Sequence, residues 1–445
     1  MVANGAVRGC RDIFALAAAH RRECVNKFAA LCSIYNFHEI ETPILERAEL
    51  FARSLGPTSD VITSEMYHVA ETDPQLVLRP EGTAGVARAL RDVGLLKCAP
   101  VYGTRVWYAG QMFRHERPQH GRYRQFWQLG VEAIGDESVI TDVDVIVLAA
   151  KYMQWIECKT KLRVNTLGKK QNRKQYNEAL KEFLKHRYWG MSSLSRKRYD
   201  SGNCMRILDS KLAEDIDVMA NAPRLEEFVE EEERERFQEV CSLLKEAGVP
   251  FCVDNRLVRG LDYYTSTAFE FDGTEGKAVC AGGRYLDVCG ASGVGFAVGL
   301  DRVEKVKCDG IGSYENGLDG GVVVIGLSKS AERSGCEVGR VAREVTKAFR
   351  ERGVKCVSRL EGGRLSKVVG RAVRCGAKSV VVIGERDLTK GTAQVKYVSG
   401  EGVDEPREVA FSDVVKQVSE RIQNECGVED NGRKGWNKAK IETGT

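Results

Sequence analysis

Four arginines and two glutamates gather in one short stretch of the sequence, MFRHERPQHGRYRQFWQLGVEAIG, at positions 112–135. A guanidinium group presents paired N–H donors that match phosphate oxygens, and a carboxylate can accept the exocyclic amine of a base such as adenine. The combination indicates a nucleotide site, although a plain surface hairpin with solvated charges would carry the same residues. The charged residues are Arg114, Glu116, Arg117, Arg122, Arg124 and Glu132.

The same stretch predicts a hairpin, because two strand-like runs flank the turn residues RPQHG. Side chains alternate between the two faces of a strand. Gln128, Gly130 and Glu132 therefore share a face with Arg124 and Phe126, whereas Trp127, Leu129 and Val131 point to the other face. We expect Gly130 to leave room for a ligand between an amide and a carboxylate.

Three further segments could complete this site. In LRPEGTAG, Glu81 and Thr83 lie where a strand gives way to a helix, so the carboxylate could bind an amino group. In LVRGLDYY, Arg259 is followed by Tyr263 and Tyr264. In GVGFAVGLDR, Arg302 falls in the first turn of an expected helix, where the helix dipole also favours an anion. A tightly packed glycine-rich strand is the other interpretation of GVGFAVG.

The composition limits the class of protein. A chain of 445 residues predicts two or three domains. The 67 basic and 63 acidic residues give a weak net charge, so any nucleic-acid partner must be bound by local patches. The sequence contains neither a membrane-length apolar run nor a clear leader, and the 15 cysteines lack zinc spacing. His115 and His120 have no third ligand at metal spacing, so we predict a soluble, cytoplasmic protein without a metal site.

The elements that must position these residues follow from periodicity. Helices are expected at 11–36, 81–94 and 141–155, and strands within 37–46, 61–69, 75–80, 251–271, 278–285 and 292–299. Residues 168–250 are rich in charge and predict a helical insertion. A glycine-rich linker at 309–321 precedes alternating strands and helices, which predict a compact α/β domain. We therefore divide the chain into 1–320, interrupted by 168–250, then 321–427, and a polar tail at 428–445.

Several of these segments resemble the class II aminoacyl-tRNA synthetases. HEIETPILE, FRHERPQHGRYRQF and GVGFAVGLDRV are similar to motifs 1, 2 and 3 of that class, while VRGLDYYTSTAFEF and AVCAGGRY resemble the two signatures of the histidyl-tRNA synthetase family. The resemblance implies an α+β fold, with a class II catalytic domain on a mixed, mostly antiparallel sheet flanked by helices. It further implies a helical insertion against the acceptor arm and a C-terminal α/β anticodon-binding domain.

The resemblance also implies roles for the residues singled out above. The α-amino group of histidine would be held by Glu81, Thr83 and Gln128. Its imidazole would contact Glu132 and Tyr264, in a pocket that Tyr263 also lines. The family commonly continues the GGRY signature with Asp, but here Leu286 follows Tyr285, so we leave Arg284 and Tyr285 outside the predicted site.

On the nucleotide side, the resemblance implies that Arg114 and Arg259 are catalytic and bind the α-phosphate and the reacting carboxylate. Glu116 would bind the adenine, and Arg122 and Arg302 the remaining phosphates of ATP. The acceptor end of the tRNA would meet Arg117 and Gln119. We expect Arg114, Arg259 and Arg302 to converge on one cavity.

The implied activity is that of a histidine–tRNA ligase. Histidine and ATP, with magnesium, would form histidyl adenylate, and the histidyl group would pass to the 3′ end of tRNA(His). A homodimer would form through motif 1 around Pro43. Two alternatives remain: a noncatalytic regulatory paralogue that binds histidine, and a module that senses tRNA without charging it.

Overall fold

The computed structural model describes residues 5–55, 59, 61–96, 103–119, 121–258, 263–274, 276–303, 321–328, 337–362, 364–374, 376–399 and 402–426. The chain forms two compact units, residues 1–312 and residues 313–445, each of which is described by itself. Arg259 lies outside the described residues, as do His120 and the tail at 428–445.

The first unit is built on one eight-stranded sheet, and its two end pairs, β1 with β5 and β7 with β8, are parallel while all its other described pairs are antiparallel. This arrangement confirms the mixed, mostly antiparallel sheet of the predicted α+β fold. In spatial order the strands are β1 (His38–Glu39), β5 (Thr104–Phe113), β6 (Gln125–Ile134), β11 (Ala291–Gly299), β10 (Ala278–Val288), β9 (Tyr264–Asp272), β7 (Lys161–Thr166) and β8 (Phe251–Val253).

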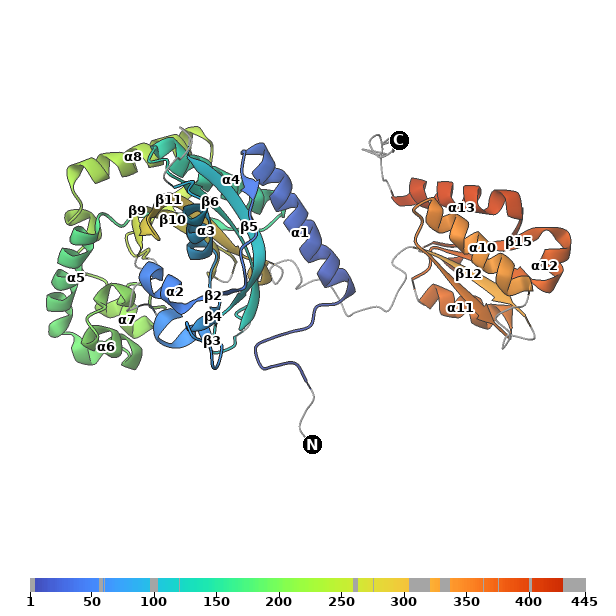
Figure 1. Cartoon of the computed structure of the whole chain (residues 1–445), viewed down its shortest axis with the longest axis horizontal. Helices are drawn as coiled ribbons and strands as arrows, with labels where there is room; N and C mark the ends of the chain where they lie inside the picture. Colours follow the sequence, from blue (N-terminus) through green and yellow to red (C-terminus); the bar gives the residue numbers. More distant parts are fainter. Residues whose placement is uncertain are drawn as a thin grey trace, which may run out of the picture. The chain divides into compact units, whose positions relative to one another are not determined.

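One face of this sheet is covered by α1 (Ala15–Ile34), α4 (Val139–Trp155) and α8 (Glu231–Glu246). Apolar side chains of these helices form a single core with Leu129 and Val131 of β6. Phe28 of α1 lies at its centre, where its ring meets Trp107, Tyr152 and Phe296 edge to face. Figure 1 shows α1 along this face, on the other side of the sheet from α2 and α3.

The opposite face carries Gln128 and Glu132, two of the predicted site residues. It is covered by α2 (Ala48–Leu55), α3 (Thr83–Asp92) and a small sheet of β2 (Leu45–Arg47), β4 (Leu76–Leu78) and β3 (Tyr67–His68). Two strand predictions were wrong in part. Residues 61–65 form a π-helical turn, and residues 37–46 hold two short strands that belong to different sheets.

The charged segment at 168–250 contains helices, as its composition predicts. They are α5 (Lys170–Lys185), α6 (Ser193–Asp200), α7 (Ala213–Val218) and α8, with short 3₁₀ turns between them. Tyr176, Leu180 and Leu184 of α5 pack into the same apolar cluster as Tyr263 and Tyr264, so the insertion is anchored next to these two tyrosines.

The second unit is an α/β sandwich, as its alternating pattern predicts. β12 (Val322–Leu327) lies parallel to β13 (Cys356–Glu361) and β14 (Ser379–Gly384), and β15 (Thr392–Ser399) is antiparallel to β14. Short strands β16 (Gly402–Val403) and β17 (Arg407–Ala410) pair with β15. One face carries α10 (Glu337–Glu351) and α13 (Phe411–Cys426), and the other α11 (Leu365–Arg374). In both units, the helices that the structure describes are too short or too polar to cross a membrane.

Candidate active site

A small cavity of about 70 Å³ lies between the start of α3 and strands β6, β10 and β11. The structure brings together here all six residues predicted to bind the amino acid, together with Arg114. The lining residues are Glu81, Thr83, Arg114, Gln128, Glu132, Tyr263, Tyr264, Ala281, Tyr285, Gly295, Phe296 and Ala297.

The alternation along β6 explains why Gln128 and Glu132 enter the cavity while Leu129 and Val131 enter the core. The expected role of Gly130 was wrong in one respect. A Cβ at this position would lie 2.3 Å from Cζ of Tyr108, whose residue pairs with Gly130 across the β5–β6 ladder. The space above Gly130 is therefore filled by the Tyr108 ring rather than left open for a ligand.

Glu132 is the most deeply buried carboxylate of the cavity, with 1% of its surface exposed. Thr83 Oγ1 donates a hydrogen bond to its Oε1 at 2.7 Å. Burial raises the pKa of Glu132 to about 8, and the nearby charge of Glu81 adds to the shift. A Cβ on Gly295 would lie 2.2 Å from Glu132 Oε2, so the glycine of β11 makes room for this carboxylate.

Glu81 closes the other side of the cavity and caps the start of α3. Its two carboxylate oxygens accept the backbone N–H groups of Thr83 and Ala84, both at 2.8 Å. A carboxylate at this position suits the positive end of a helix dipole. Burial nevertheless raises the pKa of Glu81, so two carboxyl groups with raised pKa values face the same small space.

Several polar atoms of the cavity are left without a partner. Gln128 Oε1, Glu132 Oε2 and the Tyr285 hydroxyl are buried and make no hydrogen bond within the part of the chain that the structure describes. The Tyr285 hydroxyl faces Glu132 but does not reach hydrogen-bond geometry. Such groups are costly when unpaired, so a cavity that collects them is built for a polar ligand that supplies their partners.

Tyr285 belongs to the cavity although we left it out of the predicted site. Strand β10 has a bulge between Tyr285 and Val288, and the departure from the family pattern, Leu286, lies within this bulge. Leu286 points outward with 60% of its surface exposed. Arg284 has a structural role, because it pairs with buried Asp142 and donates to the backbone oxygen of Asp136. The departure from the family pattern thus leaves Tyr285 in the cavity.

A second, larger cavity of about 910 Å³ lies beside the first one. Its volume suits a nucleotide-sized ligand. Arg122 and Arg302 line it together with Gln119, and the insertion contributes Asp209 and Lys211. Strand β10 borders both cavities, with Ala278 and Val279 in the larger one and Ala281 in the smaller.

Glu116 links the arginines of the two cavities. Its Oε1 lies 3.8 Å from Nη1 of Arg114, and its Oε2 lies 3.5 Å from Nε of Arg122. Arg302 is held by a hydrogen bond to the backbone oxygen of Ala278, and burial followed by the charge of Arg122 lowers its pKa. Arg114 and Arg302 therefore line two adjoining cavities rather than the single one that we expected.

The remaining residues of the hairpin lie at its tip. Arg117 and Gln119 are exposed, and Gln119 forms an isolated bridge with Arg122. Arg124 contributes to neither cavity. Its Nε donates to the backbone oxygen of Glu116 at 3.2 Å, so it ties the base of the loop together.

Comparison with known proteins agrees with this geometry. The family model described as "Histidyl-tRNA synthetase" matches residues 9–303, and the model described as "Anticodon binding domain" matches residues 321–421. The chain belongs to the histidyl-tRNA synthetase family. A histidine–tRNA ligase of Francisella tularensis is 35% identical over 424 residues, which cover 92% of this chain and 97% of that protein. That of Francisella philomiragia is 36% identical over 407 residues.

Solved structures show the same architecture. The crystal structure of apo histidyl-tRNA synthetase from S. aureus is 30% identical, with a TM-score of 0.69 over 93% of this chain and 99% of that chain. A protein from Bacillus halodurans described as an ATP phosphoribosyltransferase regulatory subunit/histidyl-tRNA synthetase is 19% identical, with a TM-score of 0.59 over 84% of this chain and 97% of that chain, and shares the fold.

Proposed function

We propose that the chain is a histidine–tRNA ligase that activates histidine with ATP in the two adjoining cavities and transfers it to tRNA. The observation that carries this proposal is the set of unpaired polar atoms around Glu132. An imidazole offers a donor and an acceptor on opposite sides of one ring. Glu132, Tyr264 and Tyr285 would contact the imidazole in a pocket that Tyr263 also lines. Glu81, Thr83 and Gln128 would bind the α-amino group.

The first chemical step needs no protein nucleophile. The histidine carboxylate attacks the α-phosphorus of ATP, the bond to the β-phosphate oxygen breaks, and pyrophosphate leaves. Negative charge grows on the phosphate oxygens, and preorganised cations stabilise it most effectively. Arg114 would lie at the reacting carboxylate and α-phosphate, with Arg259 as its proposed partner, and Glu116 would bind the adenine. Arg122 and Arg302 would bind the β- and γ-phosphates.

Magnesium would enter as part of the ATP substrate. The described residues provide no set of three acidic, histidine or cysteine side chains that could hold a metal. The nearby carboxylates of Asp254, Glu270 and Asp272 all bind Arg163. Magnesium commonly binds through phosphate oxygens and water, so the nucleotide itself would supply most of its ligands.

Specificity would follow from the same unpaired groups. An apolar amino acid of similar size would leave the buried oxygens unpaired, and sites of this kind discriminate by roughly 10⁴–10⁵. Histidine satisfies them, so no editing step is required for rejection of apolar competitors.

The regulatory paralogue remains the weaker alternative. The curated relatives that match almost the whole chain are named histidine–tRNA ligases, and the chain carries both a synthetase region and an anticodon-binding region. Arg114 and Arg302 line the cavities. A protein that only senses histidine would not need cations for phosphoryl chemistry.

The insertion is proposed to contact the acceptor arm of the tRNA. Residues 169–211 hold twelve Lys and Arg against four Asp and Glu, whereas residues 212–246 hold four against twelve. The basic half carries Trp189, which is 84% exposed and lies 5.9 Å from the Arg196 guanidinium. Basic and aromatic side chains together suit an RNA surface. The C-terminal unit is proposed to bind the anticodon.

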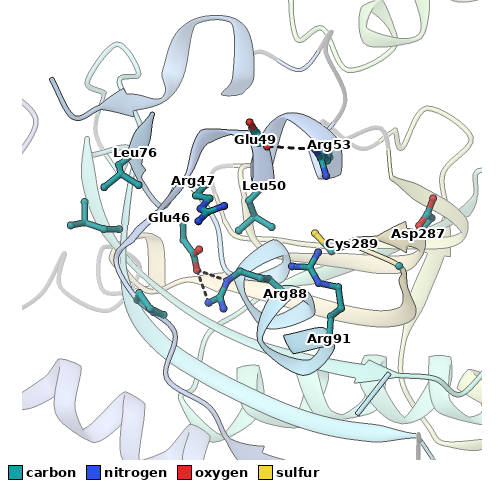
Figure 2. A pocket seen from close by; sticks show the side chains of 13 residues that line it. Glu46, Arg47, Glu49, Leu50, Arg53, Leu76, Arg88, Arg91, Asp287 and Cys289 are labelled. Atoms are coloured by element: carbon teal, nitrogen blue, oxygen red, sulfur yellow. Dashed lines mark hydrogen bonds and ion pairs between the residues drawn. The ribbon is translucent and has the colours of Figure 1, made fainter. Parts of the chain in front are cut away.

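A homodimer is proposed through the region of motif 1. A surface hollow there is lined by Pro43, Leu45, Leu50 and residues of the β10–β11 turn, and Figure 2 shows Arg47, Arg53, Arg88 and Arg91 around it. Ile44 and Leu45 are 42% and 49% exposed, which leaves apolar surface for a second copy to cover. We further propose that the protein acts in the cytoplasm.

Amino-acid-dependent ATP–pyrophosphate exchange tests the proposed function. With each of the twenty amino acids in turn, we expect exchange with histidine alone. Glu132→Gln, which keeps the size of the side chain, should raise the KM for histidine more than tenfold and leave the KM for ATP within about twofold. The exposed Glu239→Gln variant, on α8, is the matched control. Exchange that needs no histidine, or equal losses for histidine and ATP, would contradict the assignment.

A further inference from the structure

The N-terminal segment, residues 7–13, lies against the base of the arginine-rich hairpin. The backbone N–H of Arg124 donates to the carbonyl oxygen of Gly9 at 2.7 Å. Gly9 has a φ of +89°, and a Cβ there would lie 2.8 Å from Cγ of Arg124 and 3.0 Å from Cγ of Pro118. Only glycine allows both this backbone conformation and this close approach.

Side chains reinforce this contact from the hairpin. Arg124 donates through Nη1 to the carbonyl oxygen of Arg8 at 3.4 Å, and through Nε to that of Glu116. The Arg11 guanidinium lies 4.4 Å from the centroid of the Tyr123 ring. The N-terminal segment therefore touches the hairpin at its loop and at the residues that lead into β6.

Asp301 connects this segment to the second cavity. Its carboxylate is 5% exposed and pairs through Oδ1 with Arg11 of the segment and, at 2.9 Å, with Arg21 of α1. Its Oδ2 accepts the backbone N–H of Trp127 on β6 at 2.7 Å. One buried carboxylate thus joins the N-terminal segment, α1 and the hairpin to the helical turn that carries Arg302.

We propose that residues 7–13 and Asp301 form a positioning clasp that sets the hairpin and Arg302 at the spacing needed to bind ATP. This inference rests on the proposed function, because its first test measures histidine-dependent pyrophosphate exchange. Arg302 follows Asp301 directly, and Glu116, whose carbonyl Arg124 holds, pairs with Arg114 and Arg122. A shift of Asp301 would therefore separate the phosphate-binding arginines. The residues that face the histidine ring, Glu132 and Tyr285, make no contact with the clasp among the interactions that the structure describes.

The test uses the full chain with Asp301→Asn, which keeps an oxygen for Trp127 but removes the charge that Arg11 and Arg21 share. Each preparation is normalised by active-site titration, because a purely structural role would lower only the fraction of active molecules. We expect the KM for ATP in pyrophosphate exchange to rise about tenfold and the KM for histidine to stay within twofold. Asp144→Asn, which breaks the pair with Arg105 at the far end of β5, is the matched control and should change neither value.

Gly9→Ala gives a second, independent variant on the other side of the clasp. Its added methyl group should push the segment from Arg124 and produce the same selective rise in the KM for ATP. If Asp301→Asn does not fold, Gly9→Ala decides the question. Normalised KM values for ATP that match the wild type in the folded variants, or equal rises for ATP and histidine, would overturn the proposal.

Direct titration with ATP separates the clasp from the proposed function. If the wild-type chain showed no histidine-dependent exchange, the proposed function would fail. Calorimetric ATP affinity would still compare wild type with Gly9→Ala and Asp301→Asn. A weaker affinity in both variants would support the clasp, and an unchanged affinity would refute it.

Discussion

The two adjoining cavities differ in size and in the side chains that line them. The small one is lined mostly by buried polar side chains, with Glu132 at a raised pKa and several polar atoms without a hydrogen-bond partner among the described residues. The large one is open to the insertion and lined by charged groups, among them Arg122, Arg302, Lys211 and Arg163. Selective recognition of a small ligand comes from unsatisfied hydrogen bonds, whereas binding and activation of a polyanion come from fixed charge.

The largest expected effect lies in the charged cavity. Arg302→Gln should reduce the rate of histidine-dependent exchange at saturating substrates by about 10²–10³, because it removes one preorganised cation from the transition state. The KM for histidine should change little, since Arg302 lies outside the small cavity. Steady-state exchange measures both constants, and Arg340→Gln, a 59% exposed arginine of α10, is the control for lost charge. If Arg302→Gln raised only the KM for histidine and left the exchange rate unchanged, histidine binding and phosphate chemistry would not be separated between the two cavities.

Histidine binding in the small cavity should be sensitive to a change in packing beside it. Gly130→Ala would place a methyl group 2.3 Å from Cζ of Tyr108, so the ring must move or the strands must separate. Overpacking of this kind typically costs about 1–3 kcal/mol. We expect a lower melting temperature and a KM for histidine raised about tenfold, measured by differential scanning calorimetry and exchange.

A paired substitution checks the cause of that loss. Tyr108→Ala in the Gly130→Ala background removes the ring that the methyl group meets and should recover part of the histidine affinity. If the double variant binds histidine no better than Gly130→Ala, the Tyr108 ring is not what transmits the change.

Buried Glu132 should also make the stability of the ligand-free protein depend on pH. Glu132 has a folded-state pKa near 8 against an ordinary value of 4.5, so the native state binds a proton that the unfolded chain releases. Stability from this group is therefore complete below about pH 4.5 and is lost as the pH rises toward 8. Glu132→Gln removes the titration and should melt a few degrees above the wild type at pH 8 but not at pH 5.

Melting curves from pH 5 to 8.5 measure this difference, with Glu239→Gln as the exposed control. The same variant is expected to lose histidine activation, so stability and function would move in opposite directions at one residue. A variant that melts below the wild type at pH 8 would mean that the ionised carboxylate is stabilised by its surroundings.

Which residues enter the small cavity and which enter the core can largely be predicted from the sequence, because this depends on the local alternation of side chains along a strand. The period of two along β6 is enough to place Gln128 and Glu132 together and opposite to Leu129 and Val131. The helix after Glu81 and the hairpin around the RPQHG turn are likewise local patterns, and all three agree with the structure.

Other features depend on long-range contacts that composition does not reveal. Tyr108 fills the space over Gly130 because of the register between two strands. Tyr285 enters the cavity because a bulge absorbs Leu286, and no simple alternation predicts a bulge. Asp301 meets Arg11 across 290 positions of sequence, so the clasp appears only once the chain is folded. The strand expected within 61–69 forms only at Tyr67–His68, because the β-branched residues at its start favour a strand only where a partner strand exists.

The smallest expected effect concerns the exposed tip of the hairpin, where Arg117 is proposed to meet tRNA. A single phosphate contact at an exposed site contributes mainly by releasing a counterion. Arg117→Gln should leave pyrophosphate exchange unchanged, weaken tRNA binding several-fold, and reduce the slope of log affinity against log salt concentration by about one. Filter binding with the tRNA between 50 and 200 mM salt measures the slope, and Gln119→Ala, which carries no charge, should not alter it. An unchanged slope in Arg117→Gln would place the tRNA elsewhere and would leave the hairpin tip with a purely local role.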